Sequence, residues 1–364
     1  MAARLRLGLI FGGRSVEHEV SVVSAEHVIA AADKERFLVV PIGVAKSGAW
    51  LSPAETRAQL AEPAPPYGKR LVSPSPQAER GPGGEVGRAD LGSAVDALAG
   101  LDVVFPLIHG THGEDGTLQG LLEIAGLPYV GCGVAASALG MDKALMKALF
   151  RAEGLPVAEH VVLRAPDDEA GVLVAAREAE RRLGYPAFVK PANGGSSVGI
   201  SKATNREELT AGIALAARHD RKIVIEKGIA GREVECGVLG NADAAASPVG
   251  EVRYRREFYD YEAKYLDPAT EVIVPADLPD DVVERAQALA LRAFHAIDGA
   301  GMSRVDFFLC PDGSLVIDEI NTIPGFTPAS MFPRLWQAKG VRYSELITRL
   351  VDLALARYKE RPVA

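Results

Sequence analysis

The sequence predicts a parallel α/β domain followed by two smaller α+β units. Three observations support this fold class. Apolar strand-like runs alternate with helical patterns over the first third of the chain, which is typical of a parallel sheet. A glycine-rich loop between short β-like runs marks the middle. An apolar hairpin, with acidic and amide residues at its far ends, marks the last third.

Composition limits the classes of partner that we expect. The chain has 364 residues, of which 48% are hydrophobic and 24% charged, enough for two or three globular domains. The net charge is −8, with acidic and basic residues interspersed, so we expect no nucleic-acid partner. No apolar run approaches the roughly 18 residues of a membrane span, so we expect no membrane partner.

Cysteine usage favours a cytoplasmic protein. Cys132, Cys236 and Cys310 are odd in number and far apart, which suits neither a disulfide framework nor a zinc site. The apolar core of the N-terminal stretch, Leu7–Phe11, is too short for a signal peptide. We therefore interpret that stretch as a first strand.

The expected N-terminal α/β domain covers residues 1–134. Within it, residues 53–95 are rich in Pro, Gly and Ser, and predict a long surface excursion with a short hairpin around Arg70–Ser73. The expected strands and helices are strand Leu5–Phe11, helix Ser21–Ala32, strand Leu38–Val44, strand Val103–Ile108 and helix Leu118–Ala125.

The remaining chain divides into two expected subdomains, 135–240 and 241–364. The second contains a polar, aromatic loop, Arg253–Tyr265, which is a candidate lid. The expected elements are helix Ala135–Glu153, strand Val157–Leu163, a helix ending at Leu183, strands Ala187–Lys190, Ile223–Glu226 and Glu233–Leu239, helix Asp280–Ile297, the hairpin and a closing helix Tyr343–Tyr358.

The hairpin raises a chemical question. A two-residue turn at Asp312-Gly313, the strongest short hairpin signal, places Asp306 opposite Glu319 and Arg304 opposite Asn321. All four side chains then share one face of the sheet. Facing carboxylates repel unless a cation lies between them. Either Arg304 pairs with both acids on a solvated edge, or a metal ion joins them; a three-residue turn with a bulge would shift this register.

The donor set at these positions favours a hard cation. Asp306, Glu319 and Asn321 offer oxygen ligands without sulfur or imidazole, which suits Mg²⁺ shared with substrate phosphates.

Three stretches are candidate phosphate loops: Gly131–Ala136, Lys190–Lys202 and His109–Gly116. Gly131–Ala136 reads GxGxxA and would suit a dinucleotide-binding oxidoreductase, with Glu153 on the ribose, but Glu153 ends a predicted helix rather than a strand. Lys190–Lys202, "KPANGGSSVGISK", has Walker A spacing, yet Ile200 stands where that motif needs lysine. It still supplies backbone N–H groups and the hydroxyls of Ser196 and Ser197, which suit a polyphosphate, or else it is the tip of a hairpin.

A ligand site is expected where two N-terminal strands end. "FGGRSVEHE" follows the first strand and "HGTHGEDG" follows Val103–Ile108, so Glu17 and His109 are candidates to meet there. The alternative is that either residue caps the next helix or lies in solvent. With Lys143, Lys190, the phosphate loop and the hairpin carboxylates, this inventory indicates nucleotide triphosphate chemistry in an ATP-grasp arrangement, because Walker A and kinase signatures are absent.

Ordered motifs across most of the chain resemble the D-alanine–D-alanine ligases, ATP-grasp enzymes of peptidoglycan precursor synthesis. Only residues 53–95 are uninformative. The motifs are "LIFGGRSVEHEVS", "HGTHGEDGTLQG", "GMDK", "KPANGGSSVGISK", "YDYEAKY", "RVDFF" and "EINTIPGFTPASM".

The resemblance implies a role for each site residue. Glu17 and His109 would hold the first D-alanine, Ser330 the carboxylate of the second, and Arg304 with the Gly325 backbone the oxyanion. Ser196 would connect Glu17 to Tyr265 and help to close the site. The implied ATP ligands are Lys143, Lys190, Ser197, Glu226, Glu233 and Lys264, and the implied ligands of two Mg²⁺ ions (with Mn²⁺ as the alternative) are Asp306, Glu319 and Asn321.

The resemblance also implies an activity and an assembly. ATP would activate the carboxylate of one D-alanine as an acyl phosphate, which the amine of the second would attack, and a homodimer is expected. Alternatives are a ligase that joins D-alanine to D-lactate, disfavoured by Tyr265 in "YDYEAKY"; another ATP-grasp carboxylate–amine ligase; the oxidoreductase; and a catalytically silent ATP-binding regulator.

Overall fold

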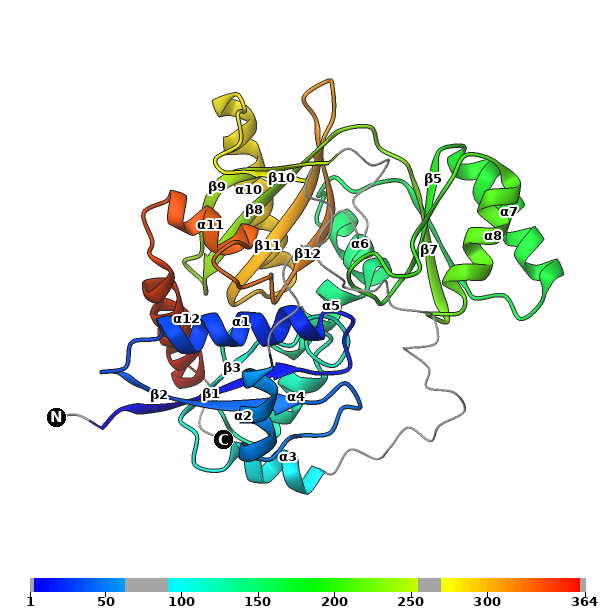
Figure 1. The fold of residues 1–364 in the computed structure, drawn as a ribbon. Coiled ribbons are helices and arrows are strands. Elements are labelled where there is room, and N and C mark those ends of the chain that lie inside the picture. Colours follow the sequence, from blue (N-terminus) through cyan, green and yellow to red (C-terminus); the bar gives the residue numbers. More distant parts are fainter. Residues whose placement is uncertain (1–2, 63–90, 255–269, 361–364) are drawn as a thin grey trace.

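The computed structural model describes residues 3–62, 91–254 and 270–360, and these form three sheets with helices around them (Figure 1). The fold is a mixed α/β arrangement, as the alternation of patterns predicts. No helix in the described ranges is both long and apolar enough to cross a membrane.

The N-terminal sheet is parallel and has the strand order β2-β1-β3. Its strands are β1 (Leu5–Gly12), β2 (Phe37–Val44) and β3 (Val103–Pro106), and its helices are α1 (His18–Ala31), α2 (Pro53–Ala61), α3 (Leu91–Leu98) and α4 (Thr117–Ile124). Ser21 on α1 joins two strand ends, because its Oγ accepts from Gly12 N at 2.8 Å and donates to Leu107 O at 2.7 Å. The loops that follow β1 and β3 therefore lie side by side.

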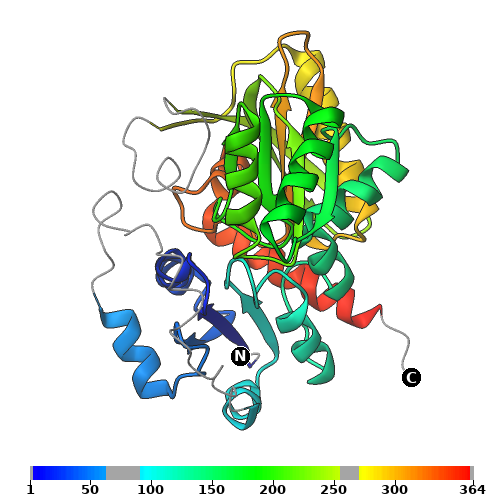
Figure 2. The same cartoon turned by 90° about the vertical axis from the view of Figure 1, so that its right-hand side faces the viewer.

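The second sheet is antiparallel, with the order β4-β7-β5-β6. Its strands are β4 (His160–Arg164), β5 (Ala187–Pro191), β6 (Ser201–Ala203) and β7 (Lys222–Lys227); its helices are α7 (Glu169–Leu183) and α8 (Arg206–Ala216). The two green helices face the viewer in Figure 2 and pack on the sheet through a separate apolar core. The loop between β5 and β6 is the predicted glycine-rich loop.

The third sheet is antiparallel, with the order β10-β9-β8-β11-β12. It comprises β8 (Arg232–Gly240), β9 (Ala245–Arg253), β10 (Glu271–Ile273), β11 (Gly301–Leu309) and β12 (Leu315–Asn321), with α10 (Asp280–Ala296) and α11 (Met331–Ala338). Helix α10 packs on the face that carries Cys236 and Val305, so the face carrying Arg304 and Asp306 is left for the site. The predicted division at 240/241 assigns β8 to the central subdomain, whereas β8 pairs within this sheet.

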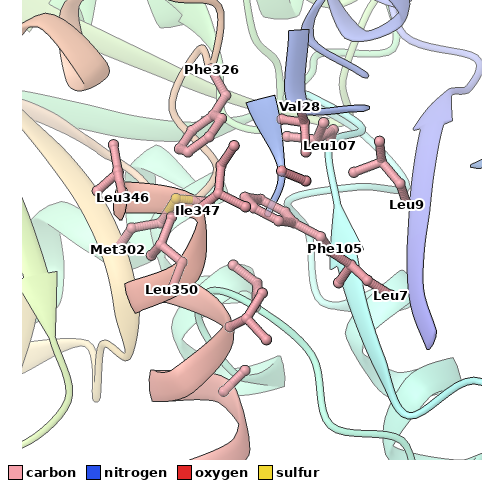
Figure 3. Close-up of a cluster of buried hydrophobic side chains, with 14 of the residues drawn as sticks. Leu7, Leu9, Val28, Phe105, Leu107, Met302, Phe326, Leu346, Ile347 and Leu350 are labelled. Carbon is pink, nitrogen blue, oxygen red and sulfur yellow. The ribbon is translucent and has the colours of Figure 1, made fainter. Parts of the chain in front are cut away.

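The last helix, α12 (Tyr343–Lys359), returns to the N-terminal sheet. Figure 3 shows Leu346, Ile347 and Leu350 of this helix beside Phe105 of β3 and Phe326. This shared core fixes the segment after β12 against the loops that follow β1 and β3.

The predicted helix Ala135–Glu153 is wrong as a single element. It is two helices, α5 (Val134–Met141) and α6 (Lys143–Ala152), separated at Asp142. Asp142 caps α6, because its Oδ1 accepts from Ala144 N and Leu145 N at 3.1 Å, and it pairs with Lys222. The break directs Lys143 toward the glycine-rich loop, where its N–H bonds Ala192 O at 2.9 Å.

Smaller corrections concern element boundaries. Strand β4 begins at His160, later than predicted, and α1 begins at His18, earlier than predicted. The excursion 53–95 includes helix α2 and the start of α3; Ser52 caps α2 with a capping box, and Pro53 occupies its first turn. The predicted hairpin around Arg70–Ser73 lies outside the described residues.

The predicted two-residue turn of the hairpin is wrong, although the predicted pairs are confirmed. Cys310 N bonds Ser314 O at 2.9 Å, so three residues lie between them, and Gly313 supplies the positive φ of +80° that this turn requires. Asp318 is an extra, bulged residue, because Phe307 pairs with Ile317 while Asp306 pairs with Glu319. The longer turn and the bulge offset each other, so Asp306 still faces Glu319, and Arg304 faces Asn321.

Candidate active site

Two cavities of about 200 and 290 Å³ meet between the three sheets. Every predicted site residue within the described ranges lines one of them or both. The first cavity contains Glu17, His109, Asn321, Gly325 and Ser330; the second contains Lys190, Ser197, Glu226, Glu233 and Asp306; Lys143, Ser196, Arg304 and Glu319 line both. The predicted Lys264, Tyr265 and most of the candidate lid lie outside the described residues.

The predicted metal ligands share one face of the hairpin, where they are matched by cations. Arg304 Nε and Nη2 each donate to a carboxylate oxygen of Asp306 at 2.7 Å, and Asn321 Nδ2 donates to Asp306 at 2.9 Å. Lys143 Nζ pairs with Glu319 Oε2 at 3.1 Å. The repulsion between the facing acids is thus offset by Arg304 for one and Lys143 for the other.

This donor set fits a cation that phosphate also ligates. Asp306 and Glu319 are hard carboxylate donors, and Asn321 adds an amide oxygen. Among residues 3–62, 91–254 and 270–360, no three His, Cys, Asp or Glu side chains group as a metal site. An ion here would need further oxygen ligands, which is the usual situation for Mg²⁺ at a nucleotide.

Glu235 of β8 is a second partner of Arg304, placed opposite Asp306 in the sheet register. Arg304 Nε lies 2.7 Å from Glu235 Oε2. Burial acts to lower the pKa of Arg304, yet Asp306 and Glu235 together hold that pKa well above its usual value. The guanidinium is therefore permanently charged and fixed at the wall between the cavities.

A buried network of two lysines and two acids forms the base of the second cavity. Lys190 Nζ lies 2.9 Å from Asp318 Oδ1 and 3.1 Å from Glu226 Oε2. Lys147, which is fully buried, lies 3.2 Å from Glu226 Oε1 and donates to Asp318 O at 3.0 Å. Burial opposes ionisation of Glu226, but the two lysines outweigh it and lower its pKa to about 2.

The glycine-rich loop closes over both cavities in a strained conformation. Ser196 and Ser197 have φ of +49° and +59°, a region that non-glycine residues rarely adopt. A Cβ built on Gly195 would lie 3.8 Å from Glu17 Oε2 and 3.9 Å from Gly110 Cα, so this loop approaches the loops after β1 and β3. Ser196 Oγ is buried and, within the described chain, has no hydrogen-bond partner.

The first cavity is formed by the segments after β1, β3 and β12. Glu17 is the N-cap residue of α1, where the helix favours a negative charge. His109 is buried; its Nδ1 lies 3.0 Å from Ile323 O, and its Nε2 has no hydrogen-bond partner in the described residues. Gly325 leaves space for Ser330, whose Oγ would lie 3.2 Å from a Cβ at that glycine.

The polar residues of the site that sequence reasoning missed include Lys147, Glu114, Glu235 and Asp318. Lys147 lies one helical turn after Lys143, a spacing that places both on one face of a helix. The bulge at Asp318 also has a signal, because the buried Ile317 and Ile320 are three residues apart rather than two. Glu114 and Glu235 had no signal beyond their charge within otherwise informative motifs.

Models of one protein family match both halves of the chain. The profile described as "D-ala D-ala ligase N-terminus" matches residues 6–132, and "D-ala D-ala ligase C-terminus" matches residues 149–352. The chain is 49% identical to the D-alanine–D-alanine ligase of Heliobacterium modesticaldum over 357 residues, which cover 98% of this chain and 96% of that protein.

Solved structures with the same ATP-grasp fold resemble the whole chain. The VanG D-Ala:D-Ser ligase from Enterococcus faecalis is 35% identical with a TM-score of 0.78, covering 97% of this chain and 100% of that one. The D-alanine–D-alanine ligase from Bacillus anthracis complexed with ATP is 28% identical with a TM-score of 0.75, covering 99% of both chains. The models of both family domains match this chain, and the identity of 49% extends over 98% of its length. This chain therefore belongs to the D-alanine–D-alanine ligase family.

Proposed function

We infer that this protein joins two D-alanine molecules to D-alanyl-D-alanine with ATP, for peptidoglycan precursor synthesis. One observation carries the inference beyond family membership: the two cavities share a wall of Lys143, Arg304 and Glu319. A reaction that transfers phosphate to an amino-acid carboxylate needs a cationic junction between a nucleotide site and an amino-acid site. The two family alternatives, a D-lactate or a D-serine acceptor, are separate outcomes of the test below.

The first cavity suits the amino acids. We propose that Glu17 binds the ammonium of the first D-alanine and that His109 lies beside it. Ser330 would bind the carboxylate of the second D-alanine. Arg304 and the Gly325 N–H would stabilise the oxyanion of the tetrahedral intermediate, an effect worth about 3–4 kcal/mol per donor.

The second cavity suits ATP. We propose that Lys143, Lys190 and Ser197 bind its phosphates, and that Glu226 and Glu233 lie at its adenine and ribose end. Lys264, Tyr265 and the candidate lid Arg253–Tyr265 keep their predicted roles, contacting the transferred phosphate and closing the site with Ser196. Water exclusion is chemically required, because an acyl phosphate hydrolyses when wet.

Asp306, Glu319 and Asn321 would hold two Mg²⁺ ions, or Mn²⁺ in their place. The metal supplies charge neutralisation on the transferring phosphoryl group. Binding it requires a change of partners, since Asp306 is bonded by Arg304 and Glu319 by Lys143. Glu235 gives Arg304 a remaining anionic partner when Asp306 turns to a metal.

Several coarser features also remain proposals. The parallel sheet order β2-β1-β3 with its flanking helices supports a Rossmann-like N-terminal domain over residues 1–134. We keep two ATP-grasp subdomains, 135–240 and 241–364, as a prediction, although β8 of the first pairs in the sheet of the second. A homodimer and a cytoplasmic location also stay predictions from the resemblance and from composition.

The function is tested by ATP-dependent phosphate release with products identified by mass. D-alanine alone is expected to yield D-alanyl-D-alanine, and L-alanine serves as the control. Mixtures with D-lactate or D-serine would reveal another acceptor; a depsipeptide at neutral pH would overturn the amine acceptor. If the protein binds ATP but turns over none of these substrate pairs, the fold assignment stays valid and D-alanine is not its substrate.

The metal proposal has its own test. The variants Asp306→Asn and Glu319→Gln should need a higher Mg²⁺ concentration for half-maximal activity. They should also bind Mn²⁺ more weakly, as measured by electron paramagnetic resonance. Asp312→Asn, in the hairpin turn, is the matched control. Unchanged Mn²⁺ binding in both site variants would show that these residues are not ligands.

A further inference from the structure

The main chain of Ile323 is held on both sides by the loop that follows β3. Its N–H donates to Glu114 Oε1 at 2.9 Å, and its carbonyl lies 3.0 Å from His109 Nδ1. The second oxygen of Glu114, Oε2, accepts from Gly110 N at 2.6 Å. One carboxylate therefore joins the Gly110 N–H of its own loop to the N–H of Ile323, which lies 209 residues after Glu114 in the sequence.

The location of this contact gives it significance for the reaction. Glu17 and His109, on one side of the first cavity, come from the N-terminal domain, whereas Gly325 and Ser330 come from the segment after β12. Ile323 precedes Gly325 by two residues, and its side chain is buried in the core shared with α12. Its backbone position thus decides where the Gly325 N–H points relative to a ligand held by Glu17.

The same contacts also set the proton on His109. A carbonyl can only accept a hydrogen bond, so His109 Nδ1 must carry the proton that it donates to Ile323 O. Nε2 then faces the first cavity, and this atom has no hydrogen-bond partner among the described residues. Loss of the contact with Ile323 would free the ring to adopt the other tautomer.

We propose that Glu114 is a positioning residue that, with His109, aligns the two halves of the amino-acid cavity. It holds the Ile323–Gly325 backbone so that the oxyanion donor and the site of the second amino acid face the first. This inference rests on the proposed ligase function, and it assigns Glu114 no contact with a reacting atom.

The charge of Glu114 supports this role. Burial, with a smaller contribution from Glu17, raises the pKa of Glu114 to about 7. His109 and the N–H groups of Gly110 and Ile323 act in the opposite direction and lower this pKa. Accepting from two N–H groups at once is best done by the ionised form, because a protonated carboxyl uses one oxygen as a donor. The contact should therefore tighten as pH rises through about 7.

The experiment separates the two chemical steps. Hydroxylamine traps an acyl phosphate as a hydroxamate without using the site of the second amino acid, whereas dipeptide formation needs both halves aligned. Glu114→Gln places an amide donor against a backbone N–H, Glu114→Asp keeps the charge but is one methylene shorter, and Asp115→Asn removes a charge from the same loop without touching Ile323.

We expect Glu114→Gln to slow dipeptide formation about 10²-fold, with a raised KM for the second D-alanine, and to change hydroxamate formation little. Glu114→Asp should fall between it and the wild type, and Asp115→Asn should resemble the wild type. If Glu114→Gln unfolds at the assay temperature, the comparison of Glu114→Asp with Asp115→Asn decides the matter.

Equal losses in both steps, or wild-type dipeptide rates in the Gln and Asp variants, would overturn the positioning role. A wild-type protein that forms neither hydroxamate nor dipeptide would instead overturn the ligase function, and the positioning role with it.

Discussion

The two cavities solve the problem of buried polar groups in opposite ways. In the second cavity, Lys147, Lys190, Glu226 and Asp318 are paired with each other before any ligand binds. In the first, His109 Nε2 is buried without a hydrogen-bond partner within the described residues, and so is Ser196 Oγ, which lines both cavities. A buried polar atom without a hydrogen-bond partner destabilises the folded protein. A ligand that forms the missing hydrogen bonds would therefore bind more tightly to the first cavity.

Two glutamates show the physical cause of the difference. Burial acts to raise the pKa of both. Two lysines contact Glu226 and outweigh burial, so its pKa falls to about 2. The backbone N–H groups and His109 beside Glu114 do not outweigh burial, so its pKa rises to about 7. The second cavity is therefore built for permanent charge. The first is adjustable near neutral pH.

The largest expected effect comes from breaking the paired network. Lys147→Met leaves Glu226 Oε1 and the Asp318 carbonyl buried without their cation, and should lower the free energy of unfolding by about 3–5 kcal/mol. Urea unfolding measures this loss.

Lys46 supplies the matched control, because it pairs with Glu19 while 65% exposed. Lys46→Met should cost no more than about 1 kcal/mol. Similar losses in the two variants would mean that the buried network contributes nothing special.

An intermediate effect is expected from pH, with a sign set by Glu114. Between pH 4.5, its usual pKa, and about 7, the folded protein binds more protons at this group than the unfolded chain. Its contribution to stability therefore falls as pH rises through this range, by at most about 3 kcal/mol.

Glu114→Gln removes this slope. The difference in unfolding free energy between wild type and variant should shrink from about pH 5 to about pH 8 in urea titrations. A constant difference would show that the carboxyl is not titrating there. Glu226 behaves in the opposite sense: its stabilisation is complete above pH 4.5 and is lost as pH falls toward 2.

The smallest effect on stability is expected in the first cavity. Ser196→Ala removes a hydroxyl that has no partner among the described residues, so the free energy of unfolding should change by less than about 0.5 kcal/mol. Ligation should nevertheless slow at least about tenfold, because the hydroxyl is expected to close the site. Unchanged ligation would remove Ser196 from the proposed machinery.

Sequence reasoning performed best where motifs and periodicity agreed. It placed the sheet of β1, β2 and β3, the glycine-rich loop and the facing pairs Asp306–Glu319 and Arg304–Asn321. Local patterns fix the sheet and the loop, whereas the facing pairs were correct because the bulge at Asp318 offset the wrong turn.

It failed where a tertiary partner decided the outcome. The break at Asp142 brings it to Lys222 and Lys143 to the backbone of Ala192, and Glu114 contacts Ile323 across the core shared with α12. Neither partner is near in the sequence. The turn error was hidden because the bulge at Asp318 offset it.

The bulge at Asp318 is not required for strand pairing in the hairpin, but it supplies polar groups to the second cavity. Without Asp318, the pairs Phe307–Ile317 and Asp306–Glu319 would be consecutive in a regular antiparallel ladder. The residues on both sides of Asp318 would then keep their present cross-strand partners. A protein engineer could excise this single residue and retain a regular hairpin with the same inward and outward faces. The deletion would remove only the carboxylate beside Lys190 and the carbonyl beside Lys147, so this inserted residue serves the second cavity and not the sheet.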